Sequence, residues 1–124
     1  LREAFEERAS LPELRGPGFN LVKRKMKVAL KGLKSLGHSI LRAEAREIRD
    51  NVNKAMFSII KEDYLRAEMQ LENDPTCLSL QGFRNGLLTA LERLKTESKI
   101  KEEIRPKMFG SRLQSNDTKI IEAA

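Results

Sequence analysis

Apolar residues recur along most of this chain at steps of three and four positions, which is the spacing of one face of an α-helix. The first regular series contains Val22, Met26, Ala29, Leu33 and Leu36. Asn20 lies just before this series and follows a cluster of glycine and proline, so it is the expected N-cap. The spacing predicts a helix over residues 20–36. A helix that continues through Gly37 is the alternative, at a cost of about 1 kcal/mol relative to alanine.

The longest series lies in the middle of the chain and contains Leu41, Ala45, Ile48, Val52, Ala55 and Ile59. A second series overlaps it and contains Phe57, Ile60, Tyr64, Ala67 and Leu71. The overlap makes one stretch apolar on a wide face, which requires more than one packing neighbour. The pattern predicts a helix over residues 38–72, which would be more than ~50 Å long. The alternative is a break near residues 60–61, after which the pieces fold back as a four-helix bundle.

A third series follows the interruption at residues 73–75 and contains Leu80, Phe83, Leu87, Leu91 and Leu94. Asp74 is the expected N-cap, with Pro75 at the first helical position, where its missing N–H costs nothing. The series extends toward Pro106, which cannot continue a helix. The pattern predicts a third helix over residues 75–104.

These patterns predict an all-α fold of three helices, or of four, with one long central helix in a bundle or coiled-coil-like arrangement. Residues 1–18 show no sustained period and contain several helix breakers, so we expect a flexible leader there. Residues 19–106 form the predicted helical domain. Residues 107–124 are polar and contain glycine and serine, and we expect them to be largely disordered.

Positive charge is concentrated in one part of the chain. No acidic residue occurs between Glu13 and Glu44, whereas eight lysines and arginines lie there. The formal net charge of the whole chain is +6, so the remainder is slightly acidic. A local positive field of this kind attracts anionic partners.

The basic segment has three interpretations, all of which concern Lys23, Arg24, Lys25, Lys27, Lys31 and Lys34. The run from Lys23 to Lys27 resembles a short nuclear-import signal that would bind an import receptor. The spacing of the lysines also gives a positive stripe along a helix, which suits contact with nucleic acid or an acidic membrane surface. The third interpretation is simple solvation of a helix face.

The sequence offers little for catalysis. His38 and Cys77 are the single histidine and the single cysteine, and they fall on different predicted helices. Nucleophilic catalysis requires a base beside the nucleophile, and metal sites require clustered ligands. We therefore expect no enzyme, no cofactor and no metal site. One cysteine allows no intramolecular disulfide, which suits a reducing environment.

The length of the central helix suggests self-association, because its shorter neighbours cannot cover all of its apolar face. We expect a homodimer or a helix-to-helix contact with another protein. The residues expected in the dimer or core seam are Leu41, Ile48, Val52, Ala55, Ile59, Leu80, Phe83, Leu87, Leu91 and Leu94.

The start of the chain, Leu1-Arg2 followed by Glu6-Glu7-Arg8, resembles the delivery region of oomycete RXLR effectors. In that family an Arg-x-Leu-Arg motif precedes an acidic stretch that ends in Glu-Glu-Arg. Here Leu1-Arg2 matches the second half of the first motif. The family's common core module uses a Trp and Tyr pair, but this chain has no Trp and one Tyr, so that module is not carried over.

The resemblance implies a protein that a plant pathogen secretes and that enters the cytoplasm and nucleus of host cells. It also implies that the protein binds a host protein and thereby suppresses plant immunity. The alternative function is a basic helical protein that associates with nucleic acid or serves as a structural scaffold subunit.

Overall fold

The computed structural model describes residues 2–36 and 45–107, and the side chains of residues 2–32 and 46–107. Within these ranges the chain forms four α-helices and no strand. The helices are α1 (Arg2–Ala9), α2 (Asn20–Leu36), α3 (Ala45–Asn73) and α4 (Leu78–Ser98). Two single turns of 3-10 helix, η1 (Pro12–Leu14) and η2 (Pro17–Phe19), connect α1 to α2. The prediction of an all-α fold is confirmed.

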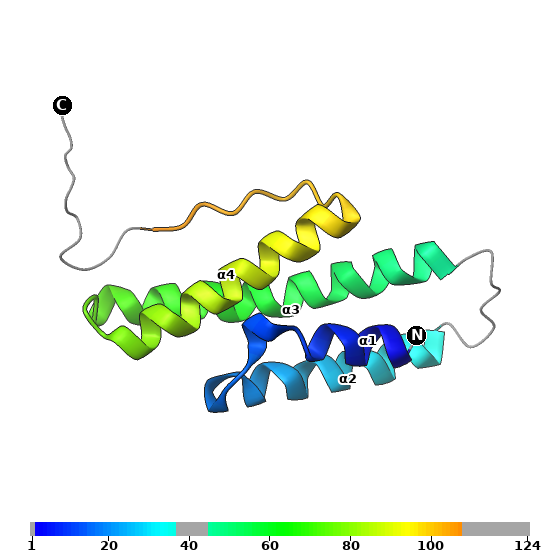
Figure 1. The fold of residues 1–124 in the computed structure, drawn as a ribbon, viewed down its shortest axis with the longest axis horizontal. Helices are drawn as coiled ribbons and strands as arrows, with labels where there is room; N and C mark the ends of the chain where they lie inside the picture. Colours follow the sequence, from blue (N-terminus) through cyan, green and yellow to red (C-terminus); the bar gives the residue numbers. More distant parts are fainter. Residues whose placement is uncertain (1, 37–44, 108–124) are drawn as a thin grey trace.

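The helices form two antiparallel pairs that pack against each other (Figure 1). One pair is α1 with α2, and the other is α3 with α4. α3 is the central helix because it touches α1, α2 and α4. Its 29 residues correspond to a length of about 43 Å. The prediction of one long helix with several neighbours is therefore confirmed. Residues 38–44 of the predicted range, 38–72, lie outside the described residues.

A single apolar core connects the two pairs. Val52, Ile60 and Tyr64 on α3 are almost completely buried, as are side chains from every other helix and both 3-10 turns. The rings of Phe19 and Phe83 lie 4.8 Å apart between centroids, which fixes η2 against α4. Full burial of one such large apolar side chain stabilises the fold by roughly 1.5–3 kcal/mol.

The break expected as an alternative near residues 60–61 does not occur, because α3 is continuous from Ala45 to Asn73. The fourth helix comes instead from the beginning of the chain. The prediction of a flexible leader over residues 1–18 is wrong for residues 2–18, which form α1, η1 and the start of η2. Phe5, Leu11 and Leu14 are buried there, and their burial is the physical reason for the order.

The predicted bounds of the third helix, 75–104, are also wrong. Residues 74–77 form a turn in which the N–H of Cys77 donates to the oxygen of Asp74, so α4 begins at Leu78 and Asp74 is not its N-cap. α4 ends at Ser98 because Lys99 adopts a left-handed conformation. Residues 99–107 then form a non-helical strap that runs back along the α3–α4 pair (Figure 1).

The strap explains why the apolar spacing continues beyond the end of α4. Ile100 and Ile104 are partly buried against the core, although they are not helical. Lys61 on α3 forms an ion pair with Glu102 of the strap. The predicted disordered tail lies outside the described residues, except for Lys107.

Gly86→Ala is expected to destabilise the protein, although alanine is the better helix former. A β-carbon at Gly86 would lie 2.9 Å from the backbone oxygen of Glu13 and 2.9 Å from Cζ of Phe19. A change of rotamer cannot move a backbone oxygen, so we expect a loss of about 1–3 kcal/mol. Urea unfolding followed by circular dichroism measures this loss.

Gly82→Ala is the matched control in the same helix, because a β-carbon there would meet nothing within 4 Å. We expect it to stabilise the protein by up to about 1 kcal/mol. Equal unfolding midpoints for the two variants would contradict the close approach of η1 and η2 to α4.

Candidate functional site

The outer side of α2 carries the basic residues that the sequence singles out. Val22 and Met26 lie in the core with 1% and 0% of their surface exposed, which fixes the inner side of the helix. Lys27 and Lys31 are exposed and lie one turn apart. Together with Lys23 and Arg24 they form what we call the basic face: Lys23, Arg24, Lys27 and Lys31. None of the four forms an ion pair with another described residue.

Lys25 has a different role from its neighbours. Its ammonium group donates to Oδ1 of Asp63 at 2.7 Å and thereby joins α2 to α3. Asp63 is 6% exposed, and its Oδ1 also accepts from Arg66 at 3.0 Å. Lys25 is therefore a structural cation. The sequence gives no sign of this role, because the two partners lie 38 positions apart. The side chain of Lys34 lies outside the described residues.

The helical conformation bears on the import-signal interpretation. Met26 is completely buried in the middle of the run from Lys23 to Lys27. A receptor that reads this run as an extended peptide would have to unwind α2 and expose Met26. The folded protein instead offers cations spaced by one helical turn. Nuclear import stays a prediction.

A groove of about 310 Å³ lies between α1 and α2 and opens beside the basic face. Phe5, Ala9, Met26 and Leu30 provide apolar walls, and Lys27 and Lys31 lie on the α2 side. On the α1 side, Arg2 and Glu6 line the groove and form an exposed ion pair at 3.3 Å. We call this feature the α1/α2 groove. Its apolar walls and positive rim suit an acidic partner with an apolar anchor.

The residues of the delivery-like motif do not share one environment. Leu1 lies outside the described residues, whereas Arg2, Glu6 and Glu7 are exposed on α1. Arg8 is buried, with 5% of its surface exposed. The last residue of the Glu-Glu-Arg sequence therefore belongs to the interior of the protein and is not presented to solvent.

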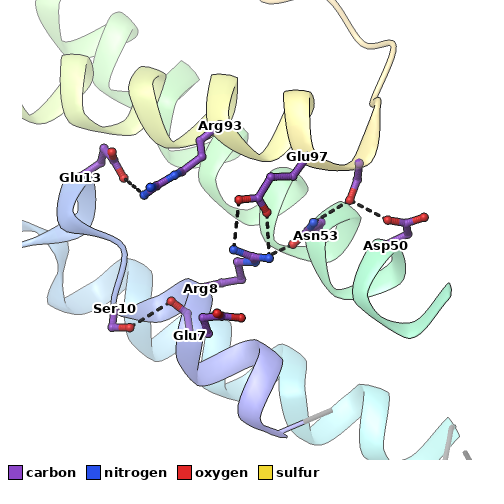
Figure 2. Close-up of polar contacts among 9 residues, drawn as sticks. Glu7, Arg8, Ser10, Glu13, Asp50, Asn53, Arg93 and Glu97 are labelled. Carbon is purple, nitrogen blue, oxygen red and sulfur yellow. Dashed lines mark hydrogen bonds and ion pairs between the residues drawn. The ribbon is translucent and has the colours of Figure 1, made fainter. Parts of the chain in front are cut away.

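Arg8 connects α1 to both helices of the other pair (Figure 2). Its Nε donates to Oδ1 of Asn53 on α3 at 2.8 Å. Its Nη2 and Nη1 contact the two carboxylate oxygens of Glu97 on α4 at 2.8 and 3.4 Å. This two-pronged geometry is the stronger form of an arginine–carboxylate pair.

The network continues from Asn53 through Ser98 to Asp50. Nδ2 of Asn53 donates to Oγ of Ser98 at 2.6 Å, and that hydroxyl donates to Asp50 at 2.8 Å (Figure 2). Side chains of α1, α3 and α4 therefore meet in one polar cluster, which we call the Arg8 network: Arg8, Asp50, Asn53, Glu97 and Ser98. Such a cluster stabilises a fold only when its members are paired, and here each has a partner.

The predicted seam residues pack within one copy of the chain. Val52, Leu87, Leu91 and Leu94 have no exposed surface. Five others are partly buried: Ile48, Ala55, Ile59, Leu80 and Phe83. Leu41 lies outside the described residues. Other apolar side chains, which lie outside the predicted seam, remain exposed: Leu21, Val28, Leu65, Met69 and Leu78. The homodimer stays a prediction. The described seam residues do not support it, because each is buried or partly buried within a single copy of the chain.

A buried carboxylate holds the end of the strap. Glu68 is 3% exposed, and its Oε2 accepts from the Tyr64 hydroxyl at 2.8 Å and from the backbone N–H of Lys107 at 2.9 Å. Nη1 of Arg84 lies 3.2 Å from the same oxygen and donates to the backbone oxygen of Lys107 at 3.0 Å. Both backbone groups of Lys107 are therefore held. A hydrogen bond to Glu72 raises the pKa of the Lys107 side chain.

The chemistry of the remaining candidates is limited. Cys77 is half-buried, and its Sγ lies 3.3 Å from Oγ of Ser79, while His38 lies outside the described residues. Among residues 2–36 and 45–107, no three side chains of His, Cys, Asp or Glu gather as metal ligands would. None of the helices that the structure describes has the length and apolar character needed to cross a membrane.

Comparisons with known proteins gave no relative. No protein-family model, no curated protein and no solved structure matches this chain.

The titration of Tyr64 tests the buried contacts of Glu68, which hold the end of the strap. Burial, followed by the hydrogen bond and negative charge of Glu68, raises the pKa of Tyr64 from 10.0 to about 12. Tyr64 is the single tyrosine, so the near-ultraviolet absorbance of phenolate reports on it alone. We expect a midpoint of about 12 in the folded protein and about 10 in urea. The unfolded chain loses this proton at a lower pH than the folded chain. The contribution of Tyr64 to the free energy of unfolding is therefore fully present below pH 10, and it is lost as pH rises toward about 12.

Tyr64→Phe should remove this contribution to the alkaline loss of stability. A folded-state midpoint near 10.0, the ordinary value for tyrosine, would contradict the buried contact with Glu68.

Arg8→Ala is expected to destabilise the protein by about 2–4 kcal/mol, because it leaves buried Asn53 without a donor and removes the pair with Glu97. Chemical unfolding measures the loss. Arg2→Ala removes an exposed ion pair on the same helix and should change stability by less than about 0.5 kcal/mol. Similar midpoints for both variants would show that the Arg8 network does not hold α1 in place.

Proposed function

We propose that this chain is a non-enzymatic effector that enters plant cells and binds an acidic surface of a host protein through the basic face and the α1/α2 groove. The main support for this proposal is the basic face. Lys23, Arg24, Lys27 and Lys31 lie on a helix that has no acidic residue, and they form no ion pair with another described residue. The resemblance of the first eight residues to an effector delivery region supports the cellular setting.

The groove and the basic face would act together on one partner. An apolar side chain of the partner would enter between Phe5, Ala9 and Leu30. Carboxylates beside that anchor would then lie near Lys27 and Lys31, which line the same groove. An acidic helix or loop with one exposed apolar residue has this chemistry.

The two contributions differ in size and in effect. Burial of one large apolar side chain contributes roughly 1.5–3 kcal/mol, whereas an exposed ion pair contributes about 0–1 kcal/mol. The apolar anchor would therefore supply most of the affinity. The cations would speed the encounter and select acidic partners over basic ones. We expect the protein to act in the host cytoplasm and nucleus, with suppression of immunity as the result.

Charge reversal of the groove rim tests the proposal in plant tissue. The wild-type protein, expressed in leaves, is expected to reduce the oxidative burst that follows an immune elicitor. Lys27→Glu with Lys31→Glu should abolish most of this reduction, because carboxylates on the rim would repel an acidic partner. Both positions are exposed, so the fold should be retained, and circular dichroism of the purified variant checks this.

Arg46→Glu with Arg49→Glu is the matched control, since these exposed residues of α3 undergo the same change in charge outside the groove. This control should suppress the burst as the wild type does. A wild-type protein without effect on the burst, or a rim variant with full effect, would refute the proposal.

A further inference from the structure

The turn that ends α4 forms a second positively lined hollow, which is separate from α2. The strap reverses direction after Ser98 and returns along α3 (Figure 1). This reversal brings Lys99 and Lys101 beside Lys54 of α3, where the three side chains line a cavity of about 420 Å³. We call this feature the turn pocket. Its volume lies within the roughly 300–1,000 Å³ range of small-molecule sites.

The charge of the turn pocket is strongly unbalanced. Lys54, Lys99 and Lys101 form no ion pair with any other described residue. Glu102 also lines the cavity, but its carboxylate is paired with Lys61. The end of α4 contributes about half a negative charge from its free carbonyl groups. Three positive charges therefore exceed the negative charge that faces them, and an anionic ligand would restore the balance.

The backbone conformation of Lys99 sets the direction of the turn. Lys99 has φ 51° and ψ 44°, and it is the one non-glycine residue with positive φ in the part of the chain that the structure describes. The N–H of Ile100 donates to the oxygen of Lys95 at 3.0 Å, which is the bond expected when a helix ends in a left-handed residue. Glycine suits this position best. Lysine here bears a backbone cost that glycine would avoid, and the attraction of its charge to the carbonyl end of α4 offsets part of that cost.

The types of residue in the pocket narrow the chemistry of the ligand. All three cations are lysines, which act as mobile point charges, and no arginine offers a planar fork for a single carboxylate. Ser58 adds a hydroxyl group, while Phe57 and Ile100 contribute apolar surface. We propose that the turn pocket binds a compact ligand that carries several phosphate groups. The ligand is either a soluble polyphosphate ester or the phosphorylated headgroup of a lipid.

Titration calorimetry with inositol hexakisphosphate tests the soluble source, and sedimentation with vesicles that contain phosphatidylinositol bisphosphate tests the lipid source. Saturable binding to either probe supports the proposal, and the probe that binds identifies the source. Lys54→Gln with Lys101→Gln should weaken that binding by roughly tenfold or more. Binding to neither probe at low ionic strength overturns the proposal.

Arg46→Gln with Arg49→Gln is the matched control, because it removes two exposed positive charges from α3 that line neither the α1/α2 groove nor the turn pocket. Binding of the control equal to that of the wild type supports the pocket. An equal loss in both double variants would show attraction to net charge alone, and it overturns the proposal. A short RNA serves as a further comparison. The proposal is also overturned if the RNA binds more strongly than both phosphate probes and the two double variants lose this binding equally.

Lys99→Gly separates binding from stability. Glycine relieves the left-handed backbone, so the unfolding temperature should rise by roughly 3 °C. Affinity for the probe should fall at the same time, because one of the three charges is gone. A variant that is more stable and binds as tightly as the wild type overturns the assignment of Lys99 to the site.

Discussion

The guanidinium group of Arg8 joins the two helical pairs, since it lies on α1 and donates to Asn53 on α3 and to Glu97 on α4. α1 has eight residues, and a helix of that length is marginal in water without tertiary support. Burial of Phe5 and the Arg8 contacts supply this support. Once α1 is docked, it covers one side of the core and forms one wall of the α1/α2 groove. The fold and the proposed binding surface therefore depend on the same contact.

The distribution of charge follows from the way carboxylates are used. Asp63 and Glu68 are buried and accept donors that tie α2 to α3 and the strap to α3. Glu97 is committed to Arg8. These acids neutralise structural donors, while the cations of the basic face and of the turn pocket have no described acidic partner. The positive surface is thus not a general property of the chain. Positive charge is exposed at those places where no carboxylate of the described residues pairs with the cations.

The sequence is informative where its periodicity coincides with helix packing. The spacing of Val22 and Met26 on α2, and of Phe57, Ile60 and Tyr64 on α3, identifies buried positions correctly. The leader escapes prediction because Phe5, Leu11 and Leu14 span a change from α-helix to 3-10 helix, so no single period connects them. The Arg8–Glu97 pair spans 89 positions, and no local pattern can reveal it. The basic segment is visible in the sequence, but the separate role of Lys25 depends on the tertiary position of Asp63.

The anchoring of the strap has a consequence for tolerance to substitution. Glu68 and Arg84 bind the main-chain N–H and oxygen of residue 107, and these groups are common to nearly all amino acids. The side chain of Lys107 adds an exposed pair with Glu72, which contributes little. Position 107 can therefore drift in evolution to almost any residue and keep its attachment. Proline is the exception, because it lacks the hydrogen that Glu68 binds.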